Sequence, residues 1–204
     1  QESQSHNLWI KAISASMFLE VYLNTSKQQK EIQLFFVIIE LCNTFECIKY
    51  TMNIIPSNIV YIGNNSDIFQ NTLQYIHKTP PGIDQLKILC ATLDELYQQV
   101  HNGENLEKIN ENGFLFFDID YEKDDIGDIK NNTLYLLKCI YIALKTKKGC
   151  IIKTWEIIHK PIIDSIYILS GVYKNVYISK PTTTQYQNDR FIICKDINQF
   201  YETR

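Results

Sequence analysis

Short apolar runs alternate with longer segments of helical pattern along most of this chain, and no other feature limits its fold as strongly. Runs such as NIVYIG (58–63) and GCIIK (149–153) are continuously apolar, which is typical of strands buried on both faces of a sheet. The segments between them have the length and spacing of helices. The alternation predicts an α/β fold, with a doubly wound, mostly parallel sheet and helices on both faces.

The expected elements follow from this pattern. We expect strands over residues 58–63, 86–91, 112–120, 149–155, 175–179 and 190–195. We expect helices over residues 8–23, 30–49, 67–77, 93–100, 131–147 and 160–173. Gly149 is expected to stop the helix before it. Because only a short segment joins the last two strands, we expect them to pair antiparallel.

The length and composition favour one domain. The chain has 204 residues, of which 45% are hydrophobic, so it is long enough to build one sizeable core. We therefore expect a single domain over 1–204, with a helical part over 1–55 and the sheet core over 56–204. The net charge of −3 gives no overall basic signature, so a contact with RNA requires a local basic patch.

Cysteines and histidines give no sign of a metal site. The six cysteines form no CxxC pair and lie mostly inside apolar runs, which indicates reduced core residues. The four histidines are dispersed, and the acidic run at 118–128 is interpreted as a solvated loop rather than a metal site. No apolar run reaches the roughly 18 residues of a membrane span, so we expect no contact with a membrane.

Charged and polar residues stand where several expected strands end. Lys153 and Lys180 each follow an apolar run, and Asp118 and Asp120 end another. A buried charge costs several kcal/mol unless it is paired or neutralised. In doubly wound sheets the ligand lies at the carboxyl ends of the strands. These residues, with the turn at 63–67, are therefore the first candidates for a site.

The same residues carry a resemblance to a known family. A strand ending in Lys153, a helix, a strand, KPTTT (180–184) and NDRFIICK (188–195) together resemble the C-terminal half of FtsJ-like ribose 2′-O-methyltransferases. Within this family the chain resembles viral mRNA cap enzymes, and the upstream half looks most like the nidovirus replicase methyltransferase domain. The fragments KEIQL (30–34), VYIGNNSD (60–67) and FLFFDID (114–120) resemble its other motifs. The resemblance is fairly specific over 149–196.

The resemblance implies a catalytic tetrad of two lysines and two acids. The family's Lys-Asp-Lys-Glu residues fall on Lys30, Asp118, Lys153 and Asp189, where this chain has Asp instead of Glu. Lys27 and Lys49 remain alternatives for the first lysine, and Asp120 remains a rival of Asp118.

The resemblance also implies S-adenosylmethionine as the cofactor, in a sheet of the seven-stranded type. The cofactor residues it implies are Gly63, Asn64, Asn65, Ser66, Asp67, Thr92, Asp94 and Asp118. The family's glycine-rich turn appears as Gly63-Asn64-Asn65, and Ala91-Thr92 stands where the family has an acid that holds the cofactor ribose. Asp94 is the nearest carboxylate, and Leu93 or Tyr121 would complete an adenine pocket.

The implied reaction explains these residue types. A ribose 2′-hydroxyl is a poor nucleophile and must lose its proton as it attacks the methyl group. A lysine accepts that proton only if its pKa is lowered toward neutrality, by a second lysine and by partial burial. The carboxylates orient the amines and favour the cationic sulfonium.

Capped RNA is the implied substrate. The resemblance places it against Lys180, Thr182, Thr183, Tyr186 and Asn188. We expect a basic strip and stacking aromatics beside it, formed by Lys145, Lys147, Lys148, Lys174, Lys180, Arg190, Tyr173, Tyr177 and Tyr186. A viral replicase protein is the implied partner, and the host cytoplasm is the implied location.

Two other functions stay open. The altered glycine turn and Asp189 favour a degenerate methyltransferase fold that has lost the cofactor and serves a capping or replication complex. An unrelated α/β nucleotide-binding protein is the weaker alternative, because no GxGxxG or GxxxxGK[ST] motif is present.

Overall fold

The structure is a computed structural model of the chain. It describes residues 27–45, 58–77, 87–104, 113–120, 126–155, 157, 159–184 and 189–198. The helix predicted over 8–23 lies outside these residues.

The described strands form one mixed sheet with the order β2-β1-β3-β4-β6-β5. The strands are β1 (Asn58–Gly63), β2 (Lys87–Ala91), β3 (Gly113–Asp118), β4 (Cys150–Thr154), β5 (Tyr173–Ser179) and β6 (Arg190–Ile197). The first four pair in parallel, and β6 runs antiparallel to both β4 and β5. The predicted antiparallel pairing of the last two strands is therefore confirmed.

The expectation of a seven-stranded sheet is wrong for the part of the chain that the structure describes, where the sheet has six strands. Helix α4 ends at His101 and β3 begins at Gly113. Residues 105–112, which lie between them, are outside the described residues.

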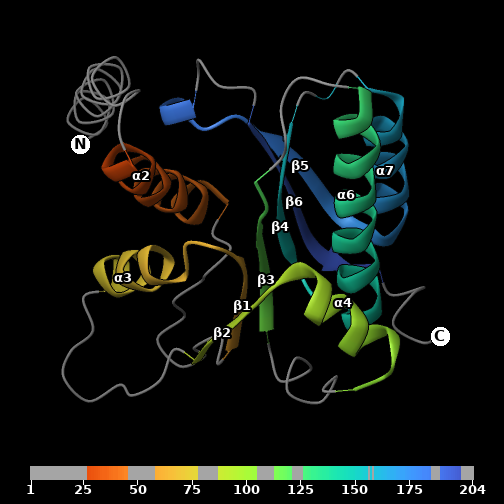
Figure 1. Ribbon diagram of the computed structural model, residues 1–204, viewed down its shortest axis with the longest axis horizontal. Helices are drawn as coiled ribbons and strands as arrows, with labels where there is room; N and C mark the ends of the chain where they lie inside the picture. Colours follow the sequence, from red (N-terminus) through yellow and green to blue (C-terminus); the bar gives the residue numbers. More distant parts are fainter. Residues whose placement is uncertain are drawn as a thin grey trace.

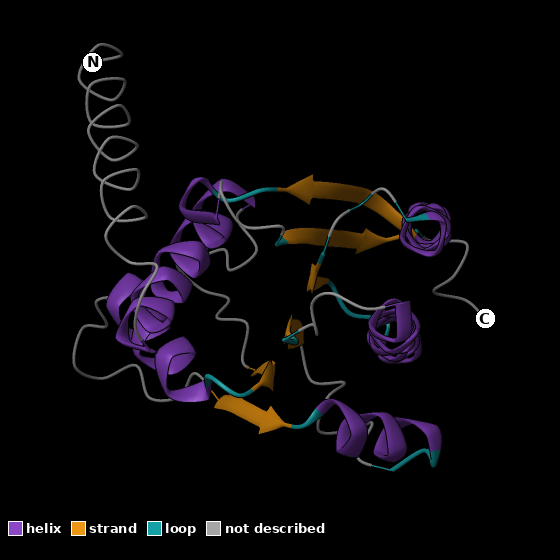
Figure 2. Ribbon diagram, turned by 45° about the horizontal axis from the view of Figure 1, so that its top comes forward, coloured by secondary structure: helices purple, strands orange, loops and turns teal. Residues whose placement is uncertain are grey.

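Helices cover both faces of the sheet, as predicted (Figures 1 and 2). One face carries α2 (Lys27–Phe45) and α3 (Ser66–His77). The other carries α4 (Leu93–His101), α6 (Ile126–Thr146) and α7 (Lys160–Val172). A short 3₁₀ helix, η1 (Thr182–Thr184), follows β5. Each face has its own hydrophobic cluster, which accounts for strands that are apolar on both sides.

The side chains of each strand alternate between these two clusters. On β1, Ile59 and Tyr61 lie in the cluster beneath α2 and α3, whereas Val60 and Ile62 lie in the cluster beneath α4, α6 and α7. Because the side-chain period of a strand is two, Gly63 lies on the face of Tyr61. This alternation decides on which face the polar ends of the strands lie.

The end of α6 differs from the prediction. The helix ends at Thr146, and Lys147, with φ 52°, is the residue in the left-handed region. Gly149 therefore does not cap the helix. A Cβ atom at Gly149 would lie 3.1 Å from the Phe114 ring and 3.2 Å from the Cys194 carbonyl oxygen. Close packing at the start of β4 is the physical reason for this glycine.

Candidate active site

The predicted site residues meet at the carboxyl edge of the parallel strands. Gly63 ends β1 and pairs with Asp118, which ends β3. Lys153 is the penultimate residue of β4 and pairs with Phe191 near the start of the antiparallel β6. Asp189 comes directly before β6. Four distant segments thus bring their polar ends to one edge, as expected for a doubly wound sheet.

Lys153, Asp118 and Gly63 also share one face of the sheet. Ile151 of β4 and Phe116 of β3 belong to the cluster beneath α2 and α3. Lys153 and Asp118 each come two residues later and therefore lie on the same face. The polar site therefore lies next to this hydrophobic cluster, on the same face of the sheet and beyond the last apolar residues of the strands.

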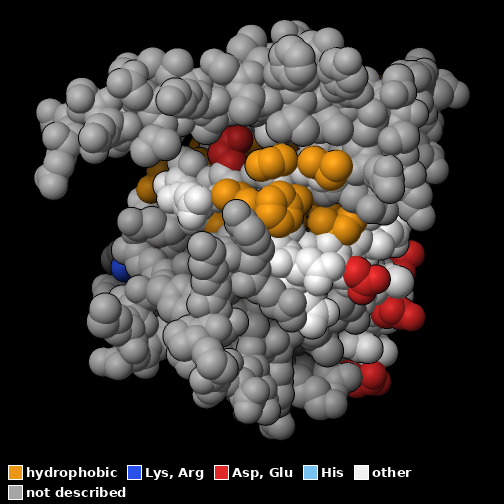
Figure 3. Space-filling view, turned by 90° about the vertical axis from the view of Figure 1, so that its left-hand side faces the viewer, with side chains coloured by type: hydrophobic (Ala, Val, Ile, Leu, Met, Phe, Trp, Pro, Cys, Tyr) orange, Lys and Arg blue, Asp and Glu red, His pale blue; other side chains and the backbone are white. Residues whose placement is uncertain are grey.

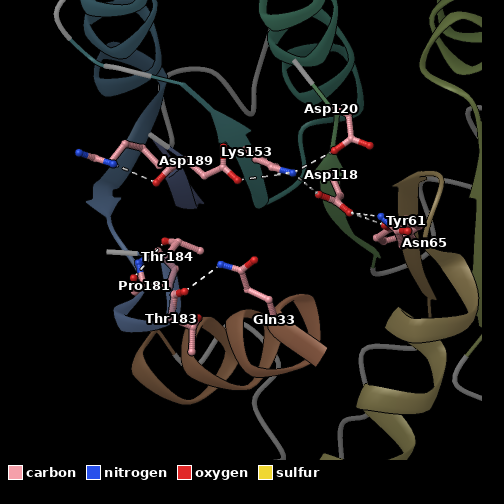
Figure 4. Close-up of polar contacts among 11 residues, drawn as sticks. Gln33, Tyr61, Asn65, Asp118, Asp120, Lys153, Pro181, Thr183, Thr184 and Asp189 are labelled. Atoms are coloured by element: carbon pink, nitrogen blue, oxygen red, sulfur yellow. Dashed lines mark hydrogen bonds and ion pairs between the residues drawn. The ribbon is translucent and has the colours of Figure 1, made fainter. Parts of the chain in front are cut away.

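Three carboxylates surround the amine of Lys153 (Figure 4). Its Nζ lies 3.1 Å from Asp118 Oδ1, 3.3 Å from Asp120 Oδ1 and 3.8 Å from Asp189 Oδ2. The Asp118 side chain is only 1% exposed and that of Lys153 is 14% exposed, whereas that of Asp120 is 69% exposed. Both acids therefore contact Lys153, Asp118 from a buried position and Asp120 from a solvated one.

The protonation state of Lys153 differs from the expectation. Burial alone would lower the pKa of Lys153, but Asp118, Asp189 and Asp120 together outweigh it and raise the pKa above its usual value. The predicted lowering of this pKa is therefore wrong for the site as described. The reason is that three acids lie within 4 Å of the amine. Lys153 is an ammonium ion at neutral pH in this state.

The second oxygen of Asp118 is held from the other side. Tyr61 Oη donates a hydrogen bond of 2.7 Å to Asp118 Oδ2, and Asn65 Nδ2 donates one of 3.2 Å to the same oxygen. Tyr61 is fully buried and packs against Phe69 and Phe116. Sequence reasoning missed Tyr61. A tyrosine inside a buried strand was the available signal, because its hydroxyl requires a partner.

Gly63 is needed where β1 meets Asp118. A Cβ atom at this position would lie 2.6 Å from the Asp118 carbonyl oxygen and 2.9 Å from Tyr61 Oη. The absent side chain therefore makes room for neighbouring protein atoms of this site.

The predicted cofactor turn lies at the same edge. Asn64 follows β1 and is exposed, Asn65 is half-buried, and Ser66 begins α3 with Asp67 in its first turn. The Asn65 amide bonds to Asp118, so this turn is tied to the carboxylates around Lys153.

The two predicted cofactor residues after β2 have partners within the chain. Thr92 caps α4 in a capping box with Glu95, and its hydroxyl donates a 2.8 Å hydrogen bond to the Glu95 carboxylate. Asp94 is exposed and accepts a 2.6 Å hydrogen bond from Lys138.

Lys30, the predicted first lysine of the tetrad, is described only by its backbone. Lys30 lies in the first turns of α2, and the structure describes no contact of its side chain. Lys27 is the first residue of α2, and Lys49 lies outside the described residues.

The KPTTT segment docks on α2 (Figure 4). The Thr182 backbone N–H donates to both carboxylate oxygens of Glu40, at 3.0 and 2.9 Å, and its hydroxyl donates to the same group at 3.3 Å. Gln33 Nε2 donates a 2.8 Å hydrogen bond to the Thr183 carbonyl oxygen. Sequence reasoning missed both α2 residues, although Glu40 inside an apolar helix was a signal that a polar partner packs there.

The predicted RNA residues are only partly described. Lys180 is exposed, Thr182 is half-buried and Thr183 is buried, whereas Tyr186 and Asn188 lie outside the described residues. Tyr173 is buried, and its hydroxyl donates to the Lys148 carbonyl oxygen at 2.6 Å. Its predicted stacking role is therefore wrong, because the ring belongs to the core beneath α4, α6 and α7.

The residues of the expected basic strip lie at the end of α6 and along β5 and β6, where Lys145, Lys147, Lys174 and Lys180 are exposed and Lys148 and Arg190 are half-buried. The face formed by α2 and α3 has a different character. Figure 3 shows hydrophobic side chains gathered in its middle and acidic ones beside them. Ile32 and Phe36 of α2 are among the exposed hydrophobic residues. A search of the described residues finds no group of three or more metal-ligating side chains and no helix able to cross a membrane.

The sheet and helices resemble solved methyltransferase structures. A structure from Plasmodium falciparum described as a ribosomal RNA methyltransferase has a TM-score of 0.57 and 15% sequence identity, covering 80% of this chain and 96% of that one. The chain has a methyltransferase fold. Human methyltransferase-like protein 13, solved with SAH, matches with a TM-score of 0.46 and 12% identity, over 80% and 83% of the two chains. No protein-family model and no curated protein sequence matches.

Within this methyltransferase fold, the residues around Lys153 mark the candidate active site. The fold brings a lysine, three carboxylates and the turn after β1 to the edge where doubly wound sheets bind ligands.

Proposed function

We propose that this chain is an S-adenosylmethionine-dependent RNA ribose 2′-O-methyltransferase. One observation carries the proposal: on a methyltransferase fold, Lys153 lies among Asp118, Asp120 and Asp189 at the ligand edge of the sheet. Carboxylates and an amine at this edge can together orient a hydroxyl, and the amine can accept its proton once the amine is neutral.

The charge of this cluster suits the proposed cofactor. Three carboxylates face one ammonium group, so a cationic sulfonium is favoured there by electrostatic attraction. The turn at Asn64–Asp67, Thr92 and Asp118 would hold the cofactor, which supplies the methyl group in activated form. The half-buried Asn65 and the exposed Asn64 leave the turn accessible beside the buried Asp118.

The chain's own residues would position the ribose and accept the proton of its 2′-hydroxyl. The carboxylates of Asp118 and Asp189 orient the Lys153 amine. In its neutral form, Lys153 would take the proton of the 2′-hydroxyl as that oxygen bonds to the methyl carbon and the bond from this carbon to the cofactor sulfur breaks, which leaves a neutral thioether. The ammonium form described above must first release its proton, and Lys30 is the residue proposed to favour that release.

The finer assignments are part of the same proposal. The substrate is capped RNA, bound by Lys180, Thr182, Thr183, Tyr186 and Asn188. The enzyme is of the viral cap type and works with a viral replicase protein in the host cytoplasm. The exposed Lys180 supports the RNA path, because it directly follows Ser179, which pairs with Phe191 two residues after Asp189 at the sheet edge.

The decisive experiment measures transfer of labelled methyl groups from S-adenosylmethionine to short capped RNA. We expect transfer in the wild type, loss in Lys153→Ala, and full activity in Lys160→Ala, whose ion pair with Asp164 lies on the surface of α7. RNA with a 2′-deoxy nucleotide at the accepting position should receive no methyl group. Transfer that persists in Lys153→Ala would overturn the assigned role.

A second candidate is a methyltransferase-like subunit that does not bind the cofactor. The observation in its favour is that the predicted cofactor residues Asn65, Thr92 and Asp94 all have protein partners. Calorimetric titration with S-adenosylmethionine separates the two functions. Absence of binding to a folded preparation supports this candidate and rejects the enzyme.

A further inference from the structure

Tyr61 of β1 has a buried ring and a hydroxyl that reaches the candidate active site. Its ring lies in the cluster beneath α2 and α3, with centroids 4.6 Å from Phe69 and 6.0 Å from Phe116. Its hydroxyl extends past Gly63 to Asp118 Oδ2, at 2.7 Å. The rigid packing of the ring fixes where this donor points.

The two oxygens of Asp118 consequently have separate partners (Figure 4). Oδ2 accepts from Tyr61 and Asn65, and Oδ1 accepts from Lys153 at 3.1 Å. A carboxylate with both oxygens engaged cannot turn about its last side-chain bond without breaking a hydrogen bond to a charged group. Tyr61 approaches from the core and Lys153 from the next strand, so they fix the plane of the carboxylate between them.

We propose that Tyr61 is a positioning residue of this site: its hydroxyl holds one oxygen of Asp118 so that the other faces Lys153. Burial, followed by the charge of Asp118, raises the pKa of the Tyr61 phenol, so the hydroxyl remains a donor at neutral pH. Gly63 makes room for this hydroxyl, since a Cβ atom there would lie 2.9 Å from Tyr61 Oη.

Tyr173 provides a matched control. It is also a buried tyrosine whose hydroxyl is bonded, but its partner is the Lys148 carbonyl oxygen and its ring packs on the opposite face of the sheet. Tyr61→Phe and Tyr173→Phe each remove one buried hydroxyl, so both should lower thermal stability. Only Tyr61→Phe removes a contact to Asp118.

The test is a pair of crystal structures of Tyr61→Phe and Tyr173→Phe in the full chain. We expect the Asp118 carboxylate to rotate in Tyr61→Phe, with loss of the 3.1 Å contact between Lys153 Nζ and Oδ1. It should stay in place in Tyr173→Phe. An unchanged carboxylate in Tyr61→Phe overturns the proposal, whatever the activity of the protein.

A second variant covers the case in which Tyr61→Phe does not fold. Asn65→Ala removes the other donor to Oδ2 from the half-buried turn and leaves Tyr61 in place. If Tyr61 holds the carboxylate, its orientation is the same in Asn65→Ala as in the wild type. A carboxylate that turns in Asn65→Ala assigns the positioning to Asn65 and overturns the role of Tyr61.

The structural test of Tyr61 does not depend on the proposed function, whereas a second test, which measures the rate of methyl transfer, does. On the same preparations, kcat should fall about 10- to 100-fold in Tyr61→Phe, because a misplaced catalytic group costs about that much. The KM for RNA should be unchanged, and Tyr173→Phe should retain both values. If the wild type transfers no methyl group, the proposed function fails while the Asp118 geometry still decides the role of Tyr61.

Discussion

Replacing Lys153 by methionine should destabilise the fold far more than replacing an equally well paired surface lysine. The ion pair of Lys153 with Asp118 is 3.1 Å long, and that of Lys160 with Asp164 is shorter, at 2.7 Å. Distance alone would therefore rank Lys160 first. Burial reverses the order, because Asp118 is 1% exposed and Asp164 is 55% exposed.

The magnitudes follow from what each variant leaves behind. Lys153→Met leaves the Asp118 carboxylate buried without its cation, and breaking a buried pair in this way costs about 3–5 kcal/mol. The bonds from Tyr61 and Asn65 remain, so we expect a loss of about 3 kcal/mol, at the lower end of that range. Lys160→Met removes an exposed i,i+4 pair worth about 0.3–0.5 kcal/mol.

Urea unfolding at pH 7, followed by circular dichroism, measures both losses. The m-values should match the wild type, which shows that the variants change stability rather than compactness. Adding Asp118→Asn to Lys153→Met removes the unpaired charge and should restore about 1–2 kcal/mol. If Lys153→Met and Lys160→Met differ by less than about 1 kcal/mol, the buried charge is not what makes Lys153 important to the fold.

Three further predictions concern the same edge of the sheet. The carboxylates outweigh burial and raise the pKa of Lys153, so its contribution to folding is complete below the unfolded pKa of about 10.4 and is lost as the pH rises beyond it. The stability difference between wild type and Lys153→Met should thus be constant up to about pH 9.5 and shrink at higher pH, and a constant difference up to about pH 11 would contradict the pairing. Gly63→Ala should lower stability by about 1–3 kcal/mol, because its Cβ would lie 2.6 Å from a backbone oxygen of Asp118; an unchanged melting temperature would show that β1 and β3 can separate there. Glu40→Ala removes the acceptor of Thr182 and should speed proteolytic cleavage near 180–189 at least several-fold, with Glu40→Gln intermediate; equal cleavage rates in all three proteins would contradict the docking.

Much of the fold could be predicted because the pattern of apolar residues shows where the strands lie and that both of their faces are buried. The continuous apolar runs gave the strands and their coverage on both faces, and the short last connection gave the antiparallel pair. The apolar runs predicted the six strands that the described sheet contains, whereas the seven-stranded type came from the resemblance alone. Gly149 was misjudged because a packing requirement and a helix cap look the same in one sequence.

The candidate site was predictable where position along a strand decides the outcome. Asp118, Lys153 and Asp189 meet because strand ends meet at one edge. The partners that come from elsewhere were not predictable. Tyr61 reaches Asp118 only through the register of β1 with β3, and Glu40 reaches Thr182 only through the placement of α2 over the sheet.

The protonation of Lys153 links the structure to the proposed chemistry. Without a ligand, the carboxylates keep the amine charged, and a charged amine cannot accept the ribose proton. A second positive charge at the cluster would act in the opposite direction, since a like charge within about 4–6 Å lowers the pKa of a lysine. The sulfonium of S-adenosylmethionine carries that charge, whereas the thioether of S-adenosylhomocysteine does not.

We therefore expect S-adenosylmethionine to lower the pKa of Lys153 by about one unit or more relative to S-adenosylhomocysteine. Lysine side chains labelled with ¹³C at Cε report this titration by NMR, and Lys153→Arg identifies the signal. The two ligands differ by one methyl group and one charge, so the comparison isolates the charge from burial by the rest of the ligand. Equal titration curves with both ligands bound would mean that the sulfonium does not reach the cluster, and release of the Lys153 proton would then depend on Lys30 alone.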